Sequence, residues 1–119
     1  MHTHANEVFD GWSAGFGLDT QPGMQTLLGL PLFHNYGAIA IGVNSFVNGA
    51  GIIMGTPSGF RGEGFFPNFW KILEHYKVDI FGAVPTIYTA LLNVPVDADI
   101  SHVELTTSGA APLLSLIHI

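Results

Sequence analysis

The sequence predicts an α/β fold, namely part of a mostly parallel sheet with helices flanking it. Short apolar runs alternate with amphipathic stretches along the chain, and the links between them are short. Strand, helix and strand in that order are typical of a parallel sheet with helical crossovers. A third observation, the low content of charged residues, bears on whether the chain is a self-contained domain.

Four stretches have helical patterns. Thr3 is placed to cap a first helix, which Gly15 and Gly17 would end. One face of this helix would carry Ala5, Val8, Phe9 and Trp12. Residues 35–47 are rich in glycine and fit a buried helix.

The other two helices begin near prolines. Pro67 stands in the first turn of the clearest helix, a position that proline favours. Its apolar face would hold Phe66, Phe69, Leu73 and Tyr76. Pro85 opens the last helix, which Asn93 and Pro95 would end. Its stripe would hold Val84, Ile87, Tyr88, Leu91 and Leu92.

Four short apolar runs are predicted to be strands, and a loop is predicted over residues 55–64. The strands would span residues 27–32, 51–54, 78–84 and 103–106. Ligands of parallel sheets bind beyond the carboxyl ends of the strands. One edge of the sheet should therefore gather the segments that follow the strands, at residues 34–36, 54–56, 85–86 and 108–112.

Charged residues make up 10% of the 119-residue chain, against about 25% in typical domains. No Asp, Glu, Lys or Arg occurs from Thr20 to Phe60. A self-contained domain of this size has to cover a large surface with polar groups. We therefore infer either a piece of the interior of a larger domain or a membrane protein.

The membrane interpretation is weak, and several other classes are disfavoured. The best window, Tyr36 to Gly55, contains five glycines and three polar residues and lacks flanking basic residues, so no spanning helix is predicted. The N-terminus shows no secretory signal, and we expect a cytoplasmic protein. A net charge of −6 argues against nucleic acid as a partner, and the absence of cysteine excludes thiolate chemistry.

Leu30 to Gly37 (LPLFHNYG) has the order expected of a strand that ends at a pocket. Pro31 disfavours a helix reaching Leu30, and Gly37 allows backbone or ligand to approach closely. His34 and Tyr36 add polar groups to apolar surroundings. Taken alone, the stretch also fits a strand end with ordinary packing aromatics.

Residues 108–113 (SGAAPL) follow the last predicted strand and are small. Such residues leave room for a flat group to lie against the backbone. The alternative is a tight strand–helix turn that needs small residues for packing alone.

Together these two motifs, about seventy residues apart, resemble the adenylate-forming superfamily of AMP-forming acyl-CoA synthetases, adenylation domains and luciferases. The segments GAGIIMGTP and FWKILEHYKVDIFGAVPTIYTALLNVP resemble the same family, and the chain looks most like an acyl-CoA synthetase. Residues 1–113 would then be a partial AMP-binding domain from the large N-terminal domain. The tail, residues 114–119, departs from the family pattern and is a candidate cloning or sequencing scar.

The resemblance implies that ATP converts a carboxylic acid into an acyl-adenylate with release of pyrophosphate, after which the thiol of CoA displaces AMP. The whole enzyme would use ATP, CoA and Mg²⁺. By position, the wall of the acyl pocket would hold His34, Tyr36, Gly37 and Ala40. The adenine and adenylate would pack on Gly109, Ala110, Ala111 and Pro112. Arg61, the nearest cation past the second strand, is assigned to CoA.

Several family motifs are absent from this sequence. These are the phosphate loop, the aromatic-Gly-x-Thr-Glu segment, the ribose-binding aspartate, and the C-terminal domain with its catalytic lysine. The chain would therefore hold no catalytic residue and no metal site, and we expect it to lack ligase activity by itself.

Two other interpretations stay open at this point. One is an adenylation domain that acts on a carrier protein. The other is a small non-enzymatic protein, membrane-associated or interacting with a partner, that is complete at this length.

Overall fold

Four parallel strands form a sheet with the spatial order β2-β1-β3-β4 in the computed structural model, which describes residues 2–112. The strands are β1 (Gln25–Leu28), β2 (Gly51–Met54), β3 (Ile80–Ala83) and β4 (Leu105–Ser108). Leu27 of β1 pairs with Ile53 of β2 on one side and with Phe81 of β3 on the other. The predicted α/β fold with a parallel sheet is confirmed.

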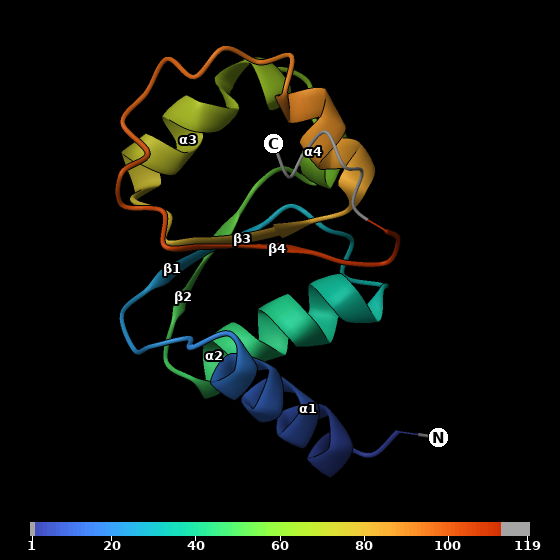
Figure 1. The fold of residues 1–119 in the computed structure, drawn as a ribbon. Coiled ribbons are helices and arrows are strands. Elements are labelled where there is room, and N and C mark those ends of the chain that lie inside the picture. The colour runs from blue at the N-terminus through green and yellow to red at the C-terminus, as the bar shows by residue number, and fades with distance from the viewer. Residues whose placement is uncertain (1, 113–119) are drawn as a thin grey trace.

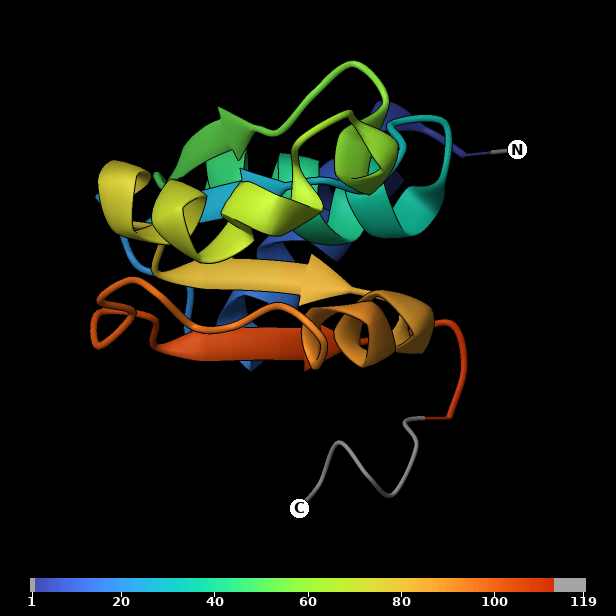
Figure 2. The same ribbon diagram turned by 90° about the horizontal axis from the view of Figure 1, so that it is seen from above.

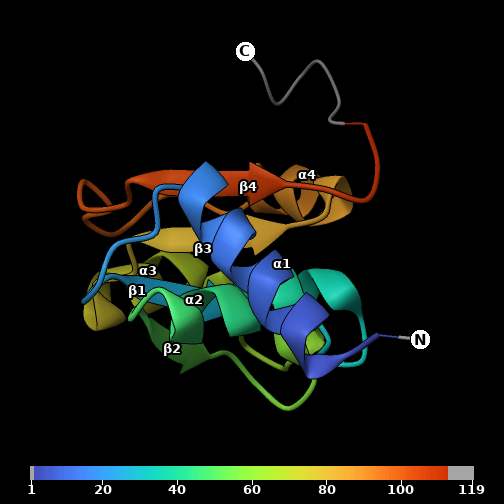
Figure 3. The same ribbon diagram turned by 90° about the horizontal axis from the view of Figure 1, so that it is seen from below.

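Helices cover both faces of the sheet (Figure 1). One layer, seen in Figure 3, consists of α1 (His4–Gly17), the π-helix η1 (Tyr36–Val43) and α2 (Asn44–Val47). The other layer, seen in Figure 2, contains α3 (Phe69–Tyr76) and α4 (Pro85–Leu91). The chain runs from β1 outward to β2 and then returns to β3. Right-handed crossovers in opposite directions place their helices on opposite faces.

β1 occupies a different stretch from the one predicted, since it ends at Leu28 and not at residue 32. The Gly29 carbonyl accepts a hydrogen bond from the backbone N–H of Phe60 at 3.1 Å, so the loop before α3 takes the position where strand pairing would continue. At its start, β1 is extended to Gln25, whose backbone N–H donates to Oδ2 of Asp79 at 2.6 Å.

β4 begins two residues later than predicted. The backbone N–H groups of Glu104 and Leu105 both donate to the carbonyl of Asp79, at 2.9 and 3.1 Å. Val103 is still in the preceding turn, where its N–H donates to the Ile100 carbonyl at 3.0 Å. Pairing with β3 therefore starts at Leu105 and continues to Ser108.

α1 has the predicted cap but packs through a different face. The Thr3 side chain accepts a hydrogen bond from the backbone N–H of Asn6, and Oδ1 of Asn6 accepts one from the backbone N–H of Thr3. Gly15 does not end the helix. It and Gly11 are buried against η1 and α2, where added Cβ atoms would collide with neighbouring side chains. The apolar stripe is exposed instead, with Val8 at 51%, Phe9 at 62% and Trp12 at 51%.

The predicted helix at residues 35–47 is present as η1 followed directly by α2. Its polar side chains bond back to the helix, because Nδ2 of Asn44 donates to the Ala40 carbonyl at 3.1 Å and Oγ of Ser45 donates to that of Ile41 at 2.8 Å. Within residues 2–112, no helix combines the length and apolar character needed to cross a membrane.

The main core lies between the sheet and α3. Pro67 lies in the short 3₁₀ turn η3 (Phe66–Asn68) that leads into α3, and not in the first turn of α3 as predicted. Phe69 and Leu73 on α3 are fully buried. The buried residues of this cluster are Leu27, Phe60, Phe65, Phe69, Leu73, Val78, Phe81, Ala83 and Leu91. The core fixes the loop that carries Phe60, and that loop forms one side of the cleft described next.

Candidate functional site

A cleft of about 930 Å³ opens at the carboxyl edge of the sheet. Its lining comes from all four segments that follow the strands, as the sequence predicted. It lies where the strand order reverses, beside the ends of β1 and β3. This is the position at which open parallel sheets bind ligands. The volume is that of a typical small-molecule pocket.

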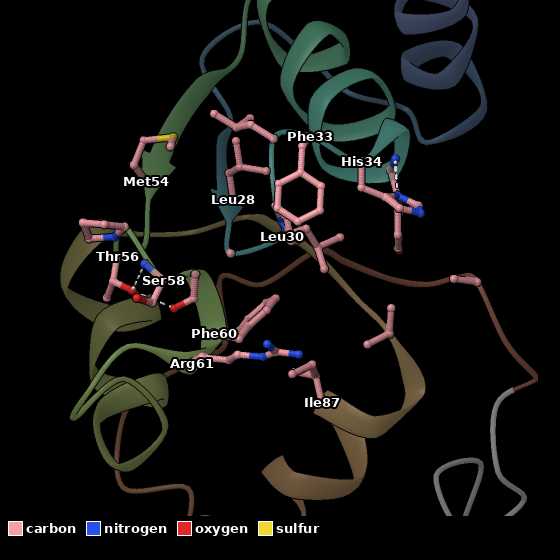
Figure 4. Close-up of a pocket in the computed structure, with 18 of the residues that line it drawn as sticks. Leu28, Leu30, Phe33, His34, Met54, Thr56, Ser58, Phe60, Arg61 and Ile87 are labelled. Carbon is pink, nitrogen blue, oxygen red and sulfur yellow. Dashed lines mark hydrogen bonds between the residues drawn. The ribbon is translucent and has the colours of Figure 1, made fainter.

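The lining of the cleft is apolar and lacks negative charge. Among the described residues that line it there is no aspartate or glutamate, although the chain carries a net charge of −6. Arg61 is the one lysine or arginine in that lining. Figure 4 shows its side chain extending toward Ile87, with Phe60 beside it. Such a cleft suits a ligand with an apolar body and an anionic group.

His34 lies in the cleft with an exposed side chain. Its Nδ1 accepts a hydrogen bond from the backbone N–H of Tyr36 at 3.1 Å. This bond holds the ring at the entry of η1 and makes Nε2 the protonated nitrogen of the neutral imidazole. The Nε2–H group is therefore left to donate to a ligand.

Tyr36 connects the two predicted motifs. It lines the cleft, and its ring packs on Gly109, where a Cβ atom would lie 3.2 Å from Cε1 of the ring. Its hydroxyl reaches β4 and lies 3.0 Å from Oγ1 of Thr107. The LPLFHNYG and SGAAPL segments, far apart in sequence, are thus in direct contact.

The structure places the remaining predicted residues in different ways. Ala110 lines the cleft and adopts a left-handed backbone with φ 69°, which is uncommon for a residue other than glycine. Gly37 is buried, and a Cβ atom there would lie 2.5 Å from the Pro31 carbonyl oxygen, so its role in this structure is close packing. Ala40 is half-buried on η1, and Ala111 and Pro112 are exposed beyond the cleft.

Sequence reasoning missed the part played by the loop that follows β2. Its 3₁₀ turn η2 (Gly59–Arg61) carries Phe60 onto Gly29 and forms one side of the cleft. Thr56 holds the loop, because its Oγ1 donates to the Gly59 carbonyl at 2.8 Å. The dense glycine spacing from residue 55 to 64 was the available signal for a tightly folded loop.

Tyr88 of α4 was also missed as a residue of this region. Its hydroxyl donates to the Thr107 carbonyl at 2.6 Å, so two tyrosines meet at one residue of β4. Burial, together with the neighbouring Tyr36 phenol, raises the pKa of Tyr88 to about 12. The α4 stripe predicted from sequence contains Tyr88, but a stripe identifies packing and not a hydrogen-bond partner.

This pKa leads to a prediction about pH. The Tyr88 phenol has a pKa of about 10 when the chain is unfolded. Because its pKa is higher in the folded chain, folding favours the neutral phenol over the phenolate. That contribution to stability is complete below pH 10 and is lost as the pH rises through about 12. We expect tyrosine absorbance at 295 nm to show a step near pH 12 that Tyr88→Phe removes. Tyr76→Phe should keep the step, and a step absent from the unmodified chain would contradict the assignment.

The chain is similar to enzymes of one family along nearly its whole length. The family model described as AMP-binding enzyme matches residues 1–116. A marinolic acid–CoA ligase of Pseudoalteromonas sp. (strain SANK 73390) is 35% identical over 97 residues. That alignment covers 81% of this chain and 15% of the ligase, so the chain spans a small part of this relative's length.

Solved structures have the same fold. The N-terminal domain of FACL13 from Mycobacterium tuberculosis superposes with a TM-score of 0.80 at 25% identity, over 98% of this chain and 28% of that one. ATP-bound MatB from Rhodopseudomonas palustris gives a TM-score of 0.81 at 24% identity, over 99% of this chain and 22% of that one. With the family match, these similarities show that the chain belongs to the family of AMP-binding enzymes.

Proposed function

We propose that this chain is part of an AMP-forming acid–CoA ligase and that its cleft holds the carboxylic acid at the point of adenylation. The observation that carries the proposal is the contact between Tyr36 and Gly109, which joins the segment expected at the acid to the segment expected at the adenylate. The similarity to a marinolic acid–CoA ligase supports the class of reaction.

The proposed reaction has two steps. A carboxylate oxygen of the acid attacks the α-phosphorus of ATP and pyrophosphate leaves, which gives an acyl-adenylate. The sulfur of CoA then attacks the acyl carbonyl carbon, and AMP leaves. Both steps require anionic groups to be held together and oriented. A cleft without carboxylates, lined by Arg61 and His34, avoids repelling these groups.

Roles follow for the individual residues. The apolar lining would receive the body of the acid, with the Nε2–H group of His34 directed at its polar end. Gly37 and Ala40 would support that wall from η1. The adenine and adenylate would lie on the loop formed by Gly109, Ala110, Ala111 and Pro112. Arg61, exposed at the cleft, would approach the phosphates of CoA.

ATP use fits the family, and one neighbour, MatB, is described as ATP-bound. Mg²⁺ is a different case, because residues 2–112 contain no group of three or more His, Asp or Glu side chains placed to hold a metal ion. We propose that any Mg²⁺ is held by other parts of the whole enzyme. A cytoplasmic location and the lack of a nucleic-acid partner remain predictions from the sequence.

The two other interpretations are less favoured. Membership of the family of AMP-binding enzymes speaks against a small non-enzymatic protein. Transfer to a carrier protein would use the same first step as transfer to CoA. The marinolic acid–CoA ligase that this chain resembles is a CoA ligase, which favours CoA as the acceptor.

Pyrophosphate release tests the proposal. We expect the complete protein, expressed from the reading frame around this chain, to release pyrophosphate with ATP and an acid from a panel of carboxylic acids. The 119-residue chain alone should give no more than a reaction without protein. His34→Ala should lower kcat/KM roughly tenfold through the loss of one positioned hydrogen-bond donor. His75→Ala, on the exposed side of α3, is the matched control. Turnover by the chain alone, or equal effects of the two variants, would contradict these assignments.

A further inference from the structure

Two phenols reach one residue of β4 from opposite faces of the sheet. Tyr36 comes from η1 and Tyr88 from α4, and these helices lie in different layers (Figure 1). Their hydroxyls donate to the carbonyl oxygen of Thr107, at 3.2 Å from Tyr36 and 2.6 Å from Tyr88. The hydroxyl of Thr107 makes a second contact, because its Oγ1 lies 3.0 Å from the Tyr36 hydroxyl oxygen. We call Tyr36, Thr107 and Tyr88 the clasp.

Two glycines make room for the clasp. A Cβ atom at Gly82 would lie 2.7 Å from Oγ1 of Thr107 and 3.1 Å from the Tyr36 hydroxyl, so any larger residue would displace both groups. A Cβ atom at Gly109 would lie 3.2 and 3.3 Å from two ring atoms of Tyr36. The backbone at the two glycines therefore leaves just the space that the Tyr36 and Thr107 side chains fill.

The segment next to the clasp needs such support. Within residues 2–112, β4 pairs with β3, and this pairing ends at Ser108. After Ser108, the link back to β3 is a long hydrogen bond of 3.4 Å from the Gly109 N–H to the Ala83 carbonyl. Ala110 then adopts its left-handed backbone, a conformation that persists only where the surroundings enforce it.

We propose that the clasp sets the position of residues 108–111 relative to the cleft, and that Thr107 and Tyr88 are positioning residues of the site. Tyr88 lies outside the cleft lining and acts through Thr107. A tyrosine phenol is protonated, and so a donor, throughout the physiological range, and burial raises the pKa of Tyr88 further. The effect on catalysis rests on the proposed ligase function, whereas the clasp itself does not.

The first test needs only the chain as it stands. Amide hydrogen exchange should be about five- to tenfold faster at Gly109 in Tyr88→Phe and in Thr107→Val, since each variant removes one hydrogen bond. Exchange at Leu27 in the core should not change. Thr107→Ser keeps the hydroxyl and should restore slow exchange, and Tyr76→Phe is the matched phenol control. Unchanged exchange at Gly109 would overturn the proposal, as would equal acceleration at Leu27.

The second test uses the complete enzyme and the same variants. A misplaced loop should lower kcat for pyrophosphate release about tenfold in Tyr88→Phe while the KM for the acid stays within about twofold, because orientation and not acid binding is lost. Equal kcat values in Tyr88→Phe and Tyr76→Phe would overturn the positioning role. If the unmodified enzyme releases no pyrophosphate with any acid, the proposed function is wrong. The hydrogen-exchange result still tests whether the clasp holds residues 108–111 in place.

Discussion

Phe69→Ala is expected to destabilise the chain by about 3–5 kcal/mol, the range for deleting a buried aromatic ring. Phe69 is fully buried, and its ring centroid lies 5.0–6.3 Å from those of Phe60, Phe65, Trp70 and Phe81. The cavity would open between the sheet and α3, where the surrounding side chains relax only in part. Since domains are typically stable by about 5–15 kcal/mol, this one substitution removes a large share of the total.

Urea unfolding followed by far-UV circular dichroism measures this loss. Phe16→Ala is the control, because it makes the same chemical change on the exposed stripe of α1, where Phe16 is 82% exposed. Its free energy of unfolding should stay within about 0.5 kcal/mol of the unmodified value. Similar losses in the two variants would mean that the core is not centred on α3.

Much of the architecture follows from local sequence patterns. The alternation of apolar runs with amphipathic stretches predicts a parallel sheet, and β2 falls on the predicted residues 51–54. Pro85 begins α4, and Thr3 caps α1. Each of these features is encoded within a few residues, so a single sequence is enough to find it. The gathering of four segments at one edge follows, because parallel strands share a direction.

The features that sequence reasoning missed depend on residues far apart in the chain. β1 ends at Leu28 because the backbone N–H of Phe60 donates to the Gly29 carbonyl, and no sequence pattern near Leu28 predicts this hydrogen bond. Helical periodicity indicates that α1 is amphipathic and so suggests a buried stripe, whereas the glycines supply the contact and the stripe stays exposed. The Tyr36–Thr107 bond spans 71 residues.

Gly59→Ala is expected to have the second-largest effect, about 2–4 kcal/mol, because it combines backbone strain with a collision. Gly59 has φ +57°, and an added Cβ atom would collide with the carbonyl oxygen of Gly29. Neither partner is a flexible side chain, so the loop has to move away from β1. The hydrogen bond from the Phe60 N–H to Gly29 would then break, and Phe60 would leave the cleft together with Arg61.

Gly23→Ala separates the two causes. Gly23 also has a positive φ, +92°, but a Cβ atom there meets nothing within 4 Å, so its substitution by alanine introduces strain alone and should cost about 1 kcal/mol. The difference in unfolding free energy between the two variants therefore measures the close approach of the loop to β1. Equal costs in the two variants would show that the loop does not lie on Gly29. Phe60 and Arg61 would then not form one side of the cleft. A larger cost for Gly59→Ala, with a changed environment for Arg61 by NMR, would tie the shape of the cleft to this one backbone contact.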